Sequence, residues 1–430
     1  MDYNQTVQYL YDSTPVFEKI GVGAYKEGLS TTLALDEHLR HPHSHYATIH
    51  VAGTNGKGSV SHTLAAILQQ SGKRVGLFTS PHLVDFRERI RVNGECVSEE
   101  FVVDFVEKHR HFFEPLFPSF FELTTAMAFD YFAQEEVDIA VIEVGLGGRL
   151  DCTNIITPLL SIITNISLDH TQLLGSTLTA IAKEKAGIIK KGVPVVIGEA
   201  NEETRPVFEQ TAERVGAPII FAEDHPIVKR MDEGPNNSNK YFTHKYGYIR
   251  GQLGGSYQLK NANTILTAVE KLCETPRFSV TKDDVKKGFA DVCHSTGLMG
   301  RWQQLSEHPT VVCDTGHNVG GWLYLSAQLK AQKCKHLHIV FGMVDDKDIH
   351  TVMAMLPKDA TYYFTKADCK RAIPESTVQE IGQLQGLQGE TYPSVAEAYN
   401  AALNAASDDD FIFVGGSSYV VADLLSTTKK

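Results

Sequence analysis

The sequence lacks the features that mark secreted, zinc-binding or membrane-spanning proteins. Its seven cysteines lie far apart and form no C-x-x-C pair, so neither a disulfide framework nor a zinc site is expected. No apolar run approaches the roughly 20 residues that a membrane helix needs. The opening MDYNQTVQYLYDSTPVF has no basic segment before an apolar one, unlike a signal peptide. We therefore expect a cytoplasmic protein with no membrane partner.

Positive charge is also scarce. There are 40 Lys and Arg residues against 52 Asp and Glu, giving a net charge of -12, which argues against nucleic acid as a partner. An anionic small substrate would need a local basic patch. At 430 residues the chain is too long for one hydrophobic core, so two domains are expected.

Short apolar runs alternate with helical patterns, which predicts an α/β fold with mainly parallel strands. Segment 225–258 instead suggests a small antiparallel excursion. A second αβ series follows the glycines near residue 298, so we expect domains at 1–298 and 299–430. The expected strands are 46–52, 74–78, 137–144, 159–166, 193–198, 218–222, 310–314, 336–342, 360–365 and 410–416.

The stretch HVAGTNGKGSV, residues 50–60, has the context of a phosphate-binding loop. A strand precedes it and an amphipathic helix follows it. Gly53, Gly56 and Gly58 allow the backbone N–H groups to turn inward, toward the positive end of the helix that begins near Ser59. Lys57 can reach terminal phosphates. The alternative is an ordinary tight turn that carries a surface lysine.

Two further strand ends supply candidate metal ligands. Glu143 ends the strand VDIAVIEV, and His170 follows LLSIITNI. Both face the crevice where α/β proteins bind ligands, and a carboxylate there suits Mg²⁺. Taken singly, Glu143 could be a solvated strand-end acid and His170 a structural residue.

Lys185 lies on the apolar stripe of the helical segment TLTAIAKEKAGIIKKG, shared with Ile181 and Ile188. A buried ammonium tends to lose its proton, and a neutral amine can react with carbon dioxide to give a metal-binding carbamate. From the residues alone, we favour a lysine that reaches out to solvent.

Arg87, Arg89 and Arg91 alternate along FRERIRVNG. In a strand they would share one face and could attract an anion. A solvated edge strand is an equally good interpretation.

Together these segments resemble the folylpolyglutamate synthase/dihydrofolate synthase family, a branch of the Mur-type ATP-dependent amide ligases. The resemblance runs in order from about residue 48 to 348. It rests on HVAGTNGKGSV, FTSPHL with FRERIRVNG, FFELTTAMAF, VIEVGLGGRLDCTN, TNISLDHTQLLG, AIAKEKAGIIK, GRWQ, DTGHN and GMVDDKD. Two positions depart from it: Val319 stands where proline is common, and Trp302 follows GR where Phe or Leu is more frequent.

The resemblance implies an N-terminal P-loop ATPase domain and a smaller C-terminal Rossmann-like domain. It implies that the ATP-binding residues are Thr54, Asn55, Gly56, Lys57, Gly58, Ser59, Asn261, Arg301, Asp314 and His317. Magnesium ligands would be Ser80, Glu143, His170 and Lys185, the last as a carbamate, which reverses the interpretation from the residues alone. The catalytic set would be Lys57, Glu143, His170 and Lys185, and the pterin-bearing substrate would lie near Phe120, Phe121, Glu122 and Leu150.

The implied reaction joins L-glutamate to dihydropteroate or to reduced folates through an acyl phosphate, with ATP and Mg²⁺ and in a monomer. Two alternatives stay open. One is a Mur-type ligase for another acid and amino acid, and the other is a nucleotide-binding homologue without ligase activity.

Overall fold

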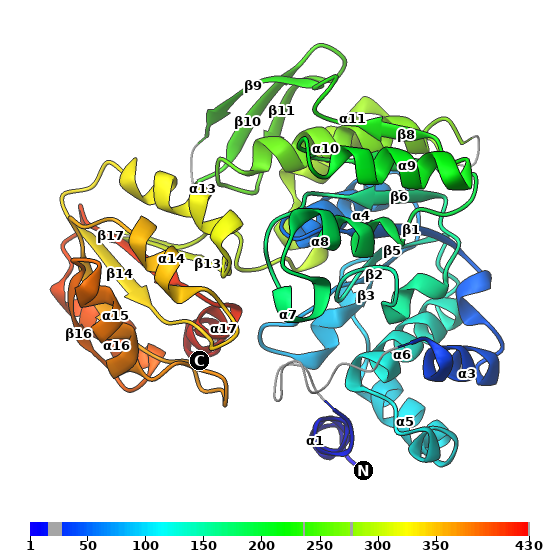
Figure 1. The fold of residues 1–430 in the computed structure, drawn as a ribbon, viewed down its shortest axis with the longest axis horizontal. Coiled ribbons are helices and arrows are strands. Elements are labelled where there is room, and N and C mark those ends of the chain that lie inside the picture. The colour runs from blue at the N-terminus through cyan, green and yellow to red at the C-terminus, as the bar shows by residue number, and fades with distance from the viewer. Residues whose placement is uncertain (16–27, 235–236, 276–277, 429–430) are drawn as a thin grey trace.

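The computed structural model describes residues 1–15, 28–234, 237–275 and 278–428. Two lobes face each other, and each is built on its own sheet (Figure 1). In these described ranges, no helix has both the length and the apolar composition for crossing a bilayer.

The larger lobe is built on an eight-stranded sheet in the order β4-β3-β2-β5-β1-β6-β7-β8. The central strand β1 pairs in parallel with β5 and with β6. The carboxyl ends of these three strands therefore meet at one edge of the sheet. The strands are β1 (Ala47–Ala52), β2 (Val75–Phe78), β3 (Ile90–Val92), β4 (Glu95–Cys96), β5 (Ile139–Glu143), β6 (Leu160–Ile163), β7 (Val195–Ile197) and β8 (Ile219–Phe221).

Helices cover both faces of this sheet. One face packs on α4 (Lys57–Gln70), α10 (Gln258–Leu272) and α11 (Lys282–Ala290). The other face packs on two helix groups, with separate cores for the two halves of the sheet. These groups are α1 (Tyr3–Ser13), α3 (Ser30–His38), α5 (Glu99–Phe113) and α6 (Phe120–Gln134), then α8 (Leu178–Ala186) and α9 (Arg205–Val215).

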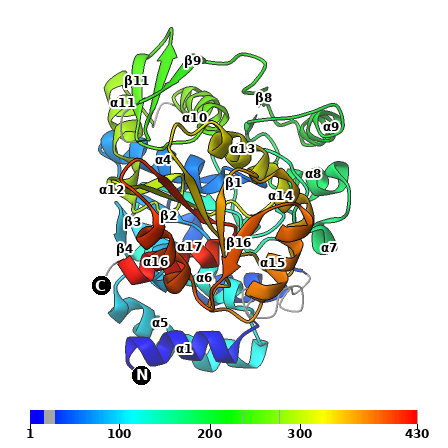
Figure 2. The same ribbon diagram turned by 90° about the vertical axis from the view of Figure 1, so that its left-hand side faces the viewer.

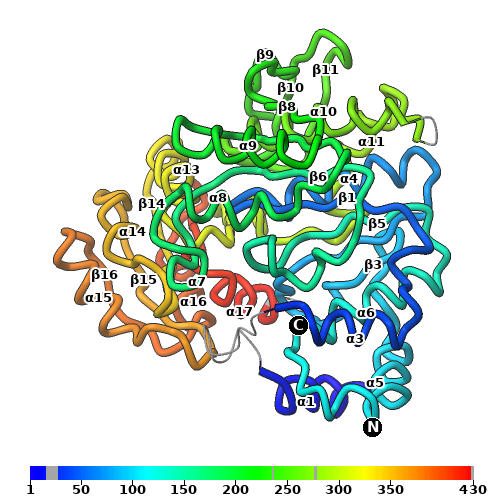
Figure 3. Tube along the Cα trace, turned by 45° about the vertical axis from the view of Figure 1, so that its right-hand side comes forward, coloured from blue at the N-terminus to red at the C-terminus, as the bar shows by residue number. Residues whose placement is uncertain are grey.

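Helix α1 lies beside α5 at the edge of the larger lobe (Figure 3), where the Tyr9 hydroxyl donates to Glu114 at 2.9 Å. The remaining short helices of this lobe are η2 (Pro42–Ser44), η3 (Phe86–Arg89), η4 (Glu114–Leu116), η5 (Cys152–Ile155), α7 (Thr171–Leu174) and α12 (Val292–Thr296).

The expected antiparallel excursion is present. Strands β9 (Val228–Glu233), β10 (Asn239–Thr243) and β11 (Gly247–Gly251) form a three-stranded antiparallel sheet. Its apolar residues Tyr241 and Ile249 join the core around α4, α10 and α11, so it extends the larger lobe.

The smaller lobe holds a six-stranded sheet in the order β12-β13-β17-β14-β15-β16, with only β12 antiparallel to its neighbour. This lobe faces the viewer in Figure 2. Its strands are β12 (Gln303–Glu307), β13 (Thr310–Asp314), β14 (Leu337–Phe341), β15 (Thr361–Phe364), β16 (Gln388–Thr391) and β17 (Phe411–Gly415).

The second sheet is also wound on both faces. Helices α13 to α15 share one core with it and α16 and α17 share another. The expected α/β class is confirmed for both lobes. The helices are α13 (Val319–Lys330), α14 (Ile349–Met355), α15 (Glu375–Leu384), α16 (Val395–Ala405) and α17 (Ser418–Thr428).

The strand expected for all three alternating arginines is wrong in its first half. Residues Phe86–Arg89 form a 3-10 helix because Asp85 caps it, accepting from the Arg87 amide at 2.9 Å. The Arg87 side chain folds back onto Asp85, whereas Arg89 and Arg91 are buried, with 2% and 8% exposed. Neither a common arginine face nor a solvated edge therefore exists.

Candidate functional site

The turn between β1 and α4 has the shape of an anion cradle. Gly53 and Gly56 have φ of +145° and +84°, which side chains rarely tolerate. A Cβ at Gly53 would lie 1.8 Å from Thr164 Oγ1, and one at Gly56 would lie 2.4 Å from Asn261 Oδ1. Gly56 is also the N-cap of α4 and has no side chain to occupy the first helical N–H groups. Those donors are therefore available to an anion.

The predicted nucleotide residues gather around this turn. Lys57 Nζ donates to the Thr54 carbonyl at 3.2 Å. The Arg301 guanidinium lies over Gly58, where a Cβ would come within 3.1 Å of it. Ser59 is buried and its hydroxyl oxygen accepts from Gln258 of α10 at 3.1 Å. The alternative interpretation, an ordinary tight turn that carries a surface lysine, does not fit these contacts around Lys57.

Two cavities meet at Lys57. We call one the polar cavity: it measures about 380 Å³ and runs over the turn toward Asn165, Glu199 and α13. We call the other the aromatic cavity: it measures about 270 Å³ and extends to Phe120, Phe121 and Leu150. The residues that line both are Thr54, Lys57, Ser80, Pro81 and His317.

Glu143 lies at the end of β5 in the wall of the polar cavity. It is 3% exposed, so it is not a solvated strand-end acid. Burial raises the pKa of its carboxyl to about 7, although the charges of Lys57 and Arg301 oppose the shift. Among the described residues, none hydrogen-bonds this carboxylate, and its oxygens therefore remain available as ligands.

His170 is the N-cap of α7, which follows β6, and it lines the aromatic cavity. Burial lowers the pKa of its imidazole to about 4, although the Asp169 charge opposes the shift. The ring is therefore neutral near neutral pH, as metal ligation requires.

Asp169 connects the two lobes. Its Oδ1 accepts from Lys347 Nζ at 2.6 Å, and its Oδ2 accepts from Asn318 Nδ2 at 2.9 Å. His317 Nε2 lies 3.4 Å from the same Oδ2. Burial would raise the pKa of Asp169, but the hydrogen bond and charge of His317, with the charge of Lys347, hold it well below its usual range. Local sequence patterns could not indicate this link, because the partners of Asp169 are 148 to 178 residues away.

Lys185 is 5% exposed and donates to the Gly53 carbonyl at 2.9 Å. The prediction from the residues alone, that it reaches solvent, is wrong. Helix α8 packs directly on the loop that follows β5. A Cβ at Gly148 in that loop would lie 3.1 Å from the Lys185 Cα. Burial, then repulsion from Lys57, lowers the pKa of its amine to about 7.

Aromatic rings and the buried carboxylate of Glu122 form the wall of the aromatic cavity that lies farthest from the β1–α4 turn. The Phe121 ring packs over Gly145, where a Cβ would meet it at 2.5 Å. Arg89 lies 5.1 Å from the centre of the Phe120 ring. Glu122 lines the cavity but also caps α6, accepting from the Ser119 amide at 2.7 Å, so part of its carboxylate is engaged within the chain.

The smaller lobe brings Arg301, Asp314 and His317 to the same place. Asp314 accepts from the Tyr257 hydroxyl at 2.8 Å and from the amides of Trp302 and Gly316 at 2.7 and 2.8 Å. It therefore braces the junction of the lobes as well as lining the polar cavity.

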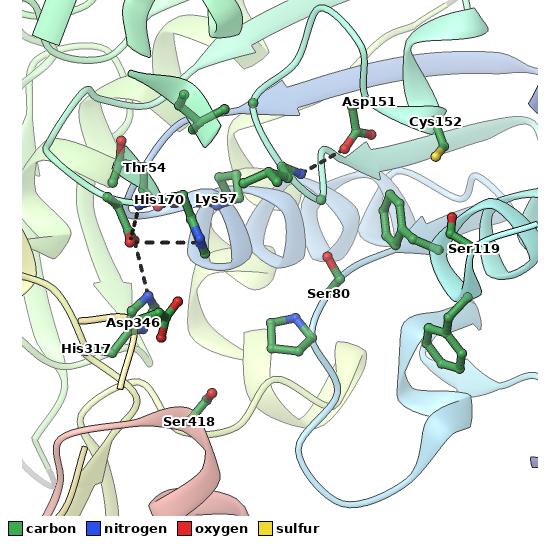
Figure 4. A pocket seen from close by; sticks show the side chains of 18 of the residues that line it. Thr54, Lys57, Ser80, Ser119, Asp151, Cys152, His170, His317, Asp346 and Ser418 are labelled. Atoms are coloured by element: carbon green, nitrogen blue, oxygen red, sulfur yellow. Dashed lines mark hydrogen bonds and ion pairs between the residues drawn. The ribbon is translucent and has the colours of Figure 1, made fainter. Parts of the chain in front are cut away.

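Sequence reasoning missed several lining residues of the smaller lobe. Figure 4 shows Asp346 and Ser418 on the side of the aromatic cavity opposite Ser119. Ser417 and Ser418 follow the glycines at the end of β17, and Ser418 is the first residue of α17. This strand–glycine–helix pattern is like that of the turn between β1 and α4, so the sequence contained a signal for these residues. The missed residues are Asp346, Lys347, Arg371, Ser417, Ser418 and Tyr419.

The predicted metal ligands lie around the junction of the cavities. Ser80 lines both cavities, Glu143 the polar one, and His170 and Lys185 the aromatic one. In the described part of the chain, no three His, Cys, Asp or Glu side chains form a metal cluster by themselves. A hard cation with few protein ligands that is completed by phosphate oxygens fits Mg²⁺, and the Glu143 carboxylate, which no described residue hydrogen-bonds, suits it.

Family models match both lobes. The Mur ligase middle domain matches residues 51–269, and the Mur ligase glutamate ligase domain matches residues 300–418.

Similar proteins cover nearly the whole chain. It is 32% identical to folylpolyglutamate synthase of Lacticaseibacillus casei, over 99% of both chains. It is 32% identical to dihydrofolate synthase/folylpolyglutamate synthase of Bacillus subtilis, over 96% of both. It is also 33% identical to a probable bifunctional folylpolyglutamate synthase/dihydropteroate synthase of Haloferax volcanii, over 99% of this chain but 50% of that protein.

Solved structures have the same fold. E. coli FolC in complex with DHPP and ADP superposes with a TM-score of 0.85 at 28% identity, covering 100% of this chain and 98% of that one. The Yersinia pestis bifunctional enzyme, complexed with AMPPNP and Mn ion, superposes with a TM-score of 0.81 at 27% identity, covering 100% and 98%. Because family models match both lobes and relatives of 32% identity cover 96% to 99% of the chain, the chain belongs to the folylpolyglutamate synthase/dihydrofolate synthase family of Mur ligases.

Proposed function

We propose that this protein is an ATP-dependent ligase that adds L-glutamate to dihydropteroate, to the γ-carboxylate of reduced folates, or to both. The observation that carries the proposal is the position of Lys57. This residue lines both the polar cavity, which runs over the glycine-rich turn, and the aromatic cavity, which has an aromatic wall. ATP activates the acid as an acyl phosphate with loss of ADP, and the glutamate amine, after losing a proton, displaces phosphate to form the amide.

The polar cavity is the proposed ATP site. Backbone N–H groups of 56–59 and the Lys57 ammonium would hold the phosphates, because a helix start and a cation both stabilise added negative charge. Asn261 and Arg301 lie directly over the turn, so they would close the phosphates from above. Asp314 and His317 would complete this wall from the smaller lobe.

Ser80, Glu143, His170 and Lys185 are the proposed holders of Mg²⁺, which when bound spreads the charge that develops on the transferred phosphate. No protein nucleophile is required, so catalysis is a matter of positioning. Lys57 orients the phosphate between the two cavities, and Asp169 holds the lobes together beside it through Lys347.

We propose that Lys185 carries a carbamate in the active enzyme. Its burial and a pKa of about 7 leave much of the amine neutral near pH 7, which is the form that reacts with carbon dioxide. Carbon-13 NMR of protein equilibrated with labelled bicarbonate would show a carbamate signal that is lost in Lys185→Arg. A labelled spectrum identical for both proteins would refute the proposal.

The aromatic cavity is the proposed site of the pterin-bearing acid. Phe120, Phe121 and Leu150 offer flat apolar surface for a ring system, and Arg89 adds charge beside it. Part of Glu122 is left to accept from ring N–H groups.

We also propose that the chain divides near residue 298 and that the protein works as a cytoplasmic monomer. The division is supported by the separate sheets and by family models that end at 269 and begin at 300. The seven thiols, all free, support a reducing compartment. Sedimentation of the purified protein would test the monomer.

The decisive experiment supplies ATP, Mg²⁺ and labelled glutamate with either dihydropteroate or a reduced folate. We expect glutamate incorporation that depends on one acid or both, which also separates a bifunctional enzyme from a specialist. Activity only with UDP-muramoyl substrates would favour the other Mur-type reaction. Nucleotide binding without turnover on any acid would favour an inactive homologue.

A further inference from the structure

The end of the polar cavity far from Lys57 contains residues with no role so far. The cavity follows the carboxyl ends of β6, β7 and β8 to Asn165, Glu199 and Glu223. In the sheet order β1-β6-β7-β8, with strands about 4.8 Å apart, β7 lies about 10 Å from the phosphate turn. A nucleoside triphosphate held at that turn and extended along the cavity would bring its base to the end of β7.

Two carboxylates are present there, and they differ in how far they are engaged. Glu223 accepts from the Ala200 amide at 2.9 Å, a normal hydrogen bond. Among the described residues, the hydrogen bond to the Glu199 carboxylate is a long one, from Asn165 Nδ2 at 3.4 Å. Lys260 Nζ lies between them and forms a long ion pair with each, at 3.6 Å from Glu199 and 3.8 Å from Glu223, so it does not distinguish the two carboxylates. Glu199 therefore keeps more acceptor capacity than Glu223.

The smaller lobe supplies a cover for the same place. Leu323 on α13 lines the cavity and is 61% exposed. The first turn of α13 lies close to the larger lobe, because a Cβ at Gly320 would come within 2.5 Å of Ser167 Oγ. An exposed apolar side chain held over a cavity gains stability when a planar group covers it.

We propose that Glu199 accepts a hydrogen bond from the exocyclic amino group of adenine while Leu323 covers the face of the base. The proposal rests on the ATP site of the proposed function and adds the residue that recognises the base. Such a contact distinguishes nucleotides, since an analogue without the amino group leaves a Glu199 oxygen without its hydrogen-bond donor.

The test compares ATP with purine riboside triphosphate, which lacks only the exocyclic amino group. In the unaltered protein we expect a KM for the analogue about tenfold above that for ATP. In Glu199→Ala this ratio should fall to about one, because ATP loses the contact that the analogue never makes. Glu223→Ala is the matched control, since it removes a carboxylate near the same lysine, and its ratio should stay close to tenfold.

Leu323→Ser tests the cover separately. We expect the KM values of both nucleotides to rise together, with their ratio unchanged. A ratio near one in the unaltered protein, or a tenfold ratio that survives Glu199→Ala, would overturn the assignment of Glu199. Failure of the unaltered protein to turn over or bind ATP would instead contradict the proposed function, so the two failures are distinguishable.

Discussion

The polar and aromatic cavities share Lys57 and Ser80 but are built from different parts of the chain. The turn at one end of the polar cavity comes from one continuous stretch, residues 54–59, with backbone N–H groups as its main donors. The walls of the aromatic cavity come from segments as distant as Ser119 and Tyr419. The turn is therefore a local structure, whereas the aromatic cavity exists only when both lobes are in place.

The largest effect is expected where the cavities meet. Lys57→Ala removes the cation that we propose stabilises the transferred phosphate, and turnover should fall by about 10³-fold. Steady-state kinetics with saturating ATP would measure it. Turnover within twofold of the unaltered protein would show that phosphate transfer does not take place at this turn.

The link between the lobes should matter next. Lys347→Met leaves the buried Asp169 carboxylate without its cation, which is strongly destabilising for a buried pair, and kcat should fall by about 10²-fold as the closed arrangement is lost. Adding Asp169→Asn should recover part of the loss. Lys366→Met is the control, because its partner Glu375 forms a surface pair with 42% of the lysine side chain exposed, and such pairs contribute little. Equal losses in the two lysine variants would contradict a specific role for the link.

A substitution in the aromatic cavity should separate the two substrates. Leu150→Ala removes apolar contact from the proposed pterin site, so the KM for the acid should rise about tenfold while that for ATP stays the same. Initial rates with each substrate varied would show this. A rise in the KM for ATP alone would exchange the roles of the cavities.

The smallest expected effect is on the pH dependence of the free energy of unfolding. It comes from two buried histidines, one near each cavity. His50 bonds Thr153 beside the aromatic cavity, and His62 bonds Thr296 behind the phosphate turn. Burial lowers the pKa of each imidazole to about 3, below the 6.5 expected when unfolded. Below pH 6.5 the unfolded chain binds more protons, so stability falls as pH falls, by about 1.4 kcal/mol per pH unit for each histidine.

Replacing either histidine with Asn should therefore reduce the slope of unfolding free energy against pH. The reduction should be about 1.4 kcal/mol per pH unit, which corresponds to one proton, and should be equal for both variants. Urea unfolding between pH 6 and pH 4.5 would measure the difference from the unaltered protein. An unchanged slope would show that the histidine is not buried in its neutral form.

The same contrast explains what the sequence could predict. The parallel strands and the phosphate turn follow from local patterns, because apolar runs and glycine spacing act within a few residues. Strands β12 and β16 escaped prediction because Gln303–Glu307 and Gln388–Thr391 are largely polar. Lys185 was misjudged without the resemblance, since its burial depends on how α8 packs on the turn, and Lys347 could not be assigned because its partner Asp169 lies in the other lobe.

The most direct test of the account is a crystal structure with a non-hydrolysable ATP analogue, Mg²⁺ and dihydropteroate. The account predicts the triphosphate within hydrogen-bond distance of the backbone amides of 56–59 and the pterin ring against Phe120 and Phe121, with Lys57 between them. A triphosphate bound elsewhere, or both ligands in one cavity, would contradict it.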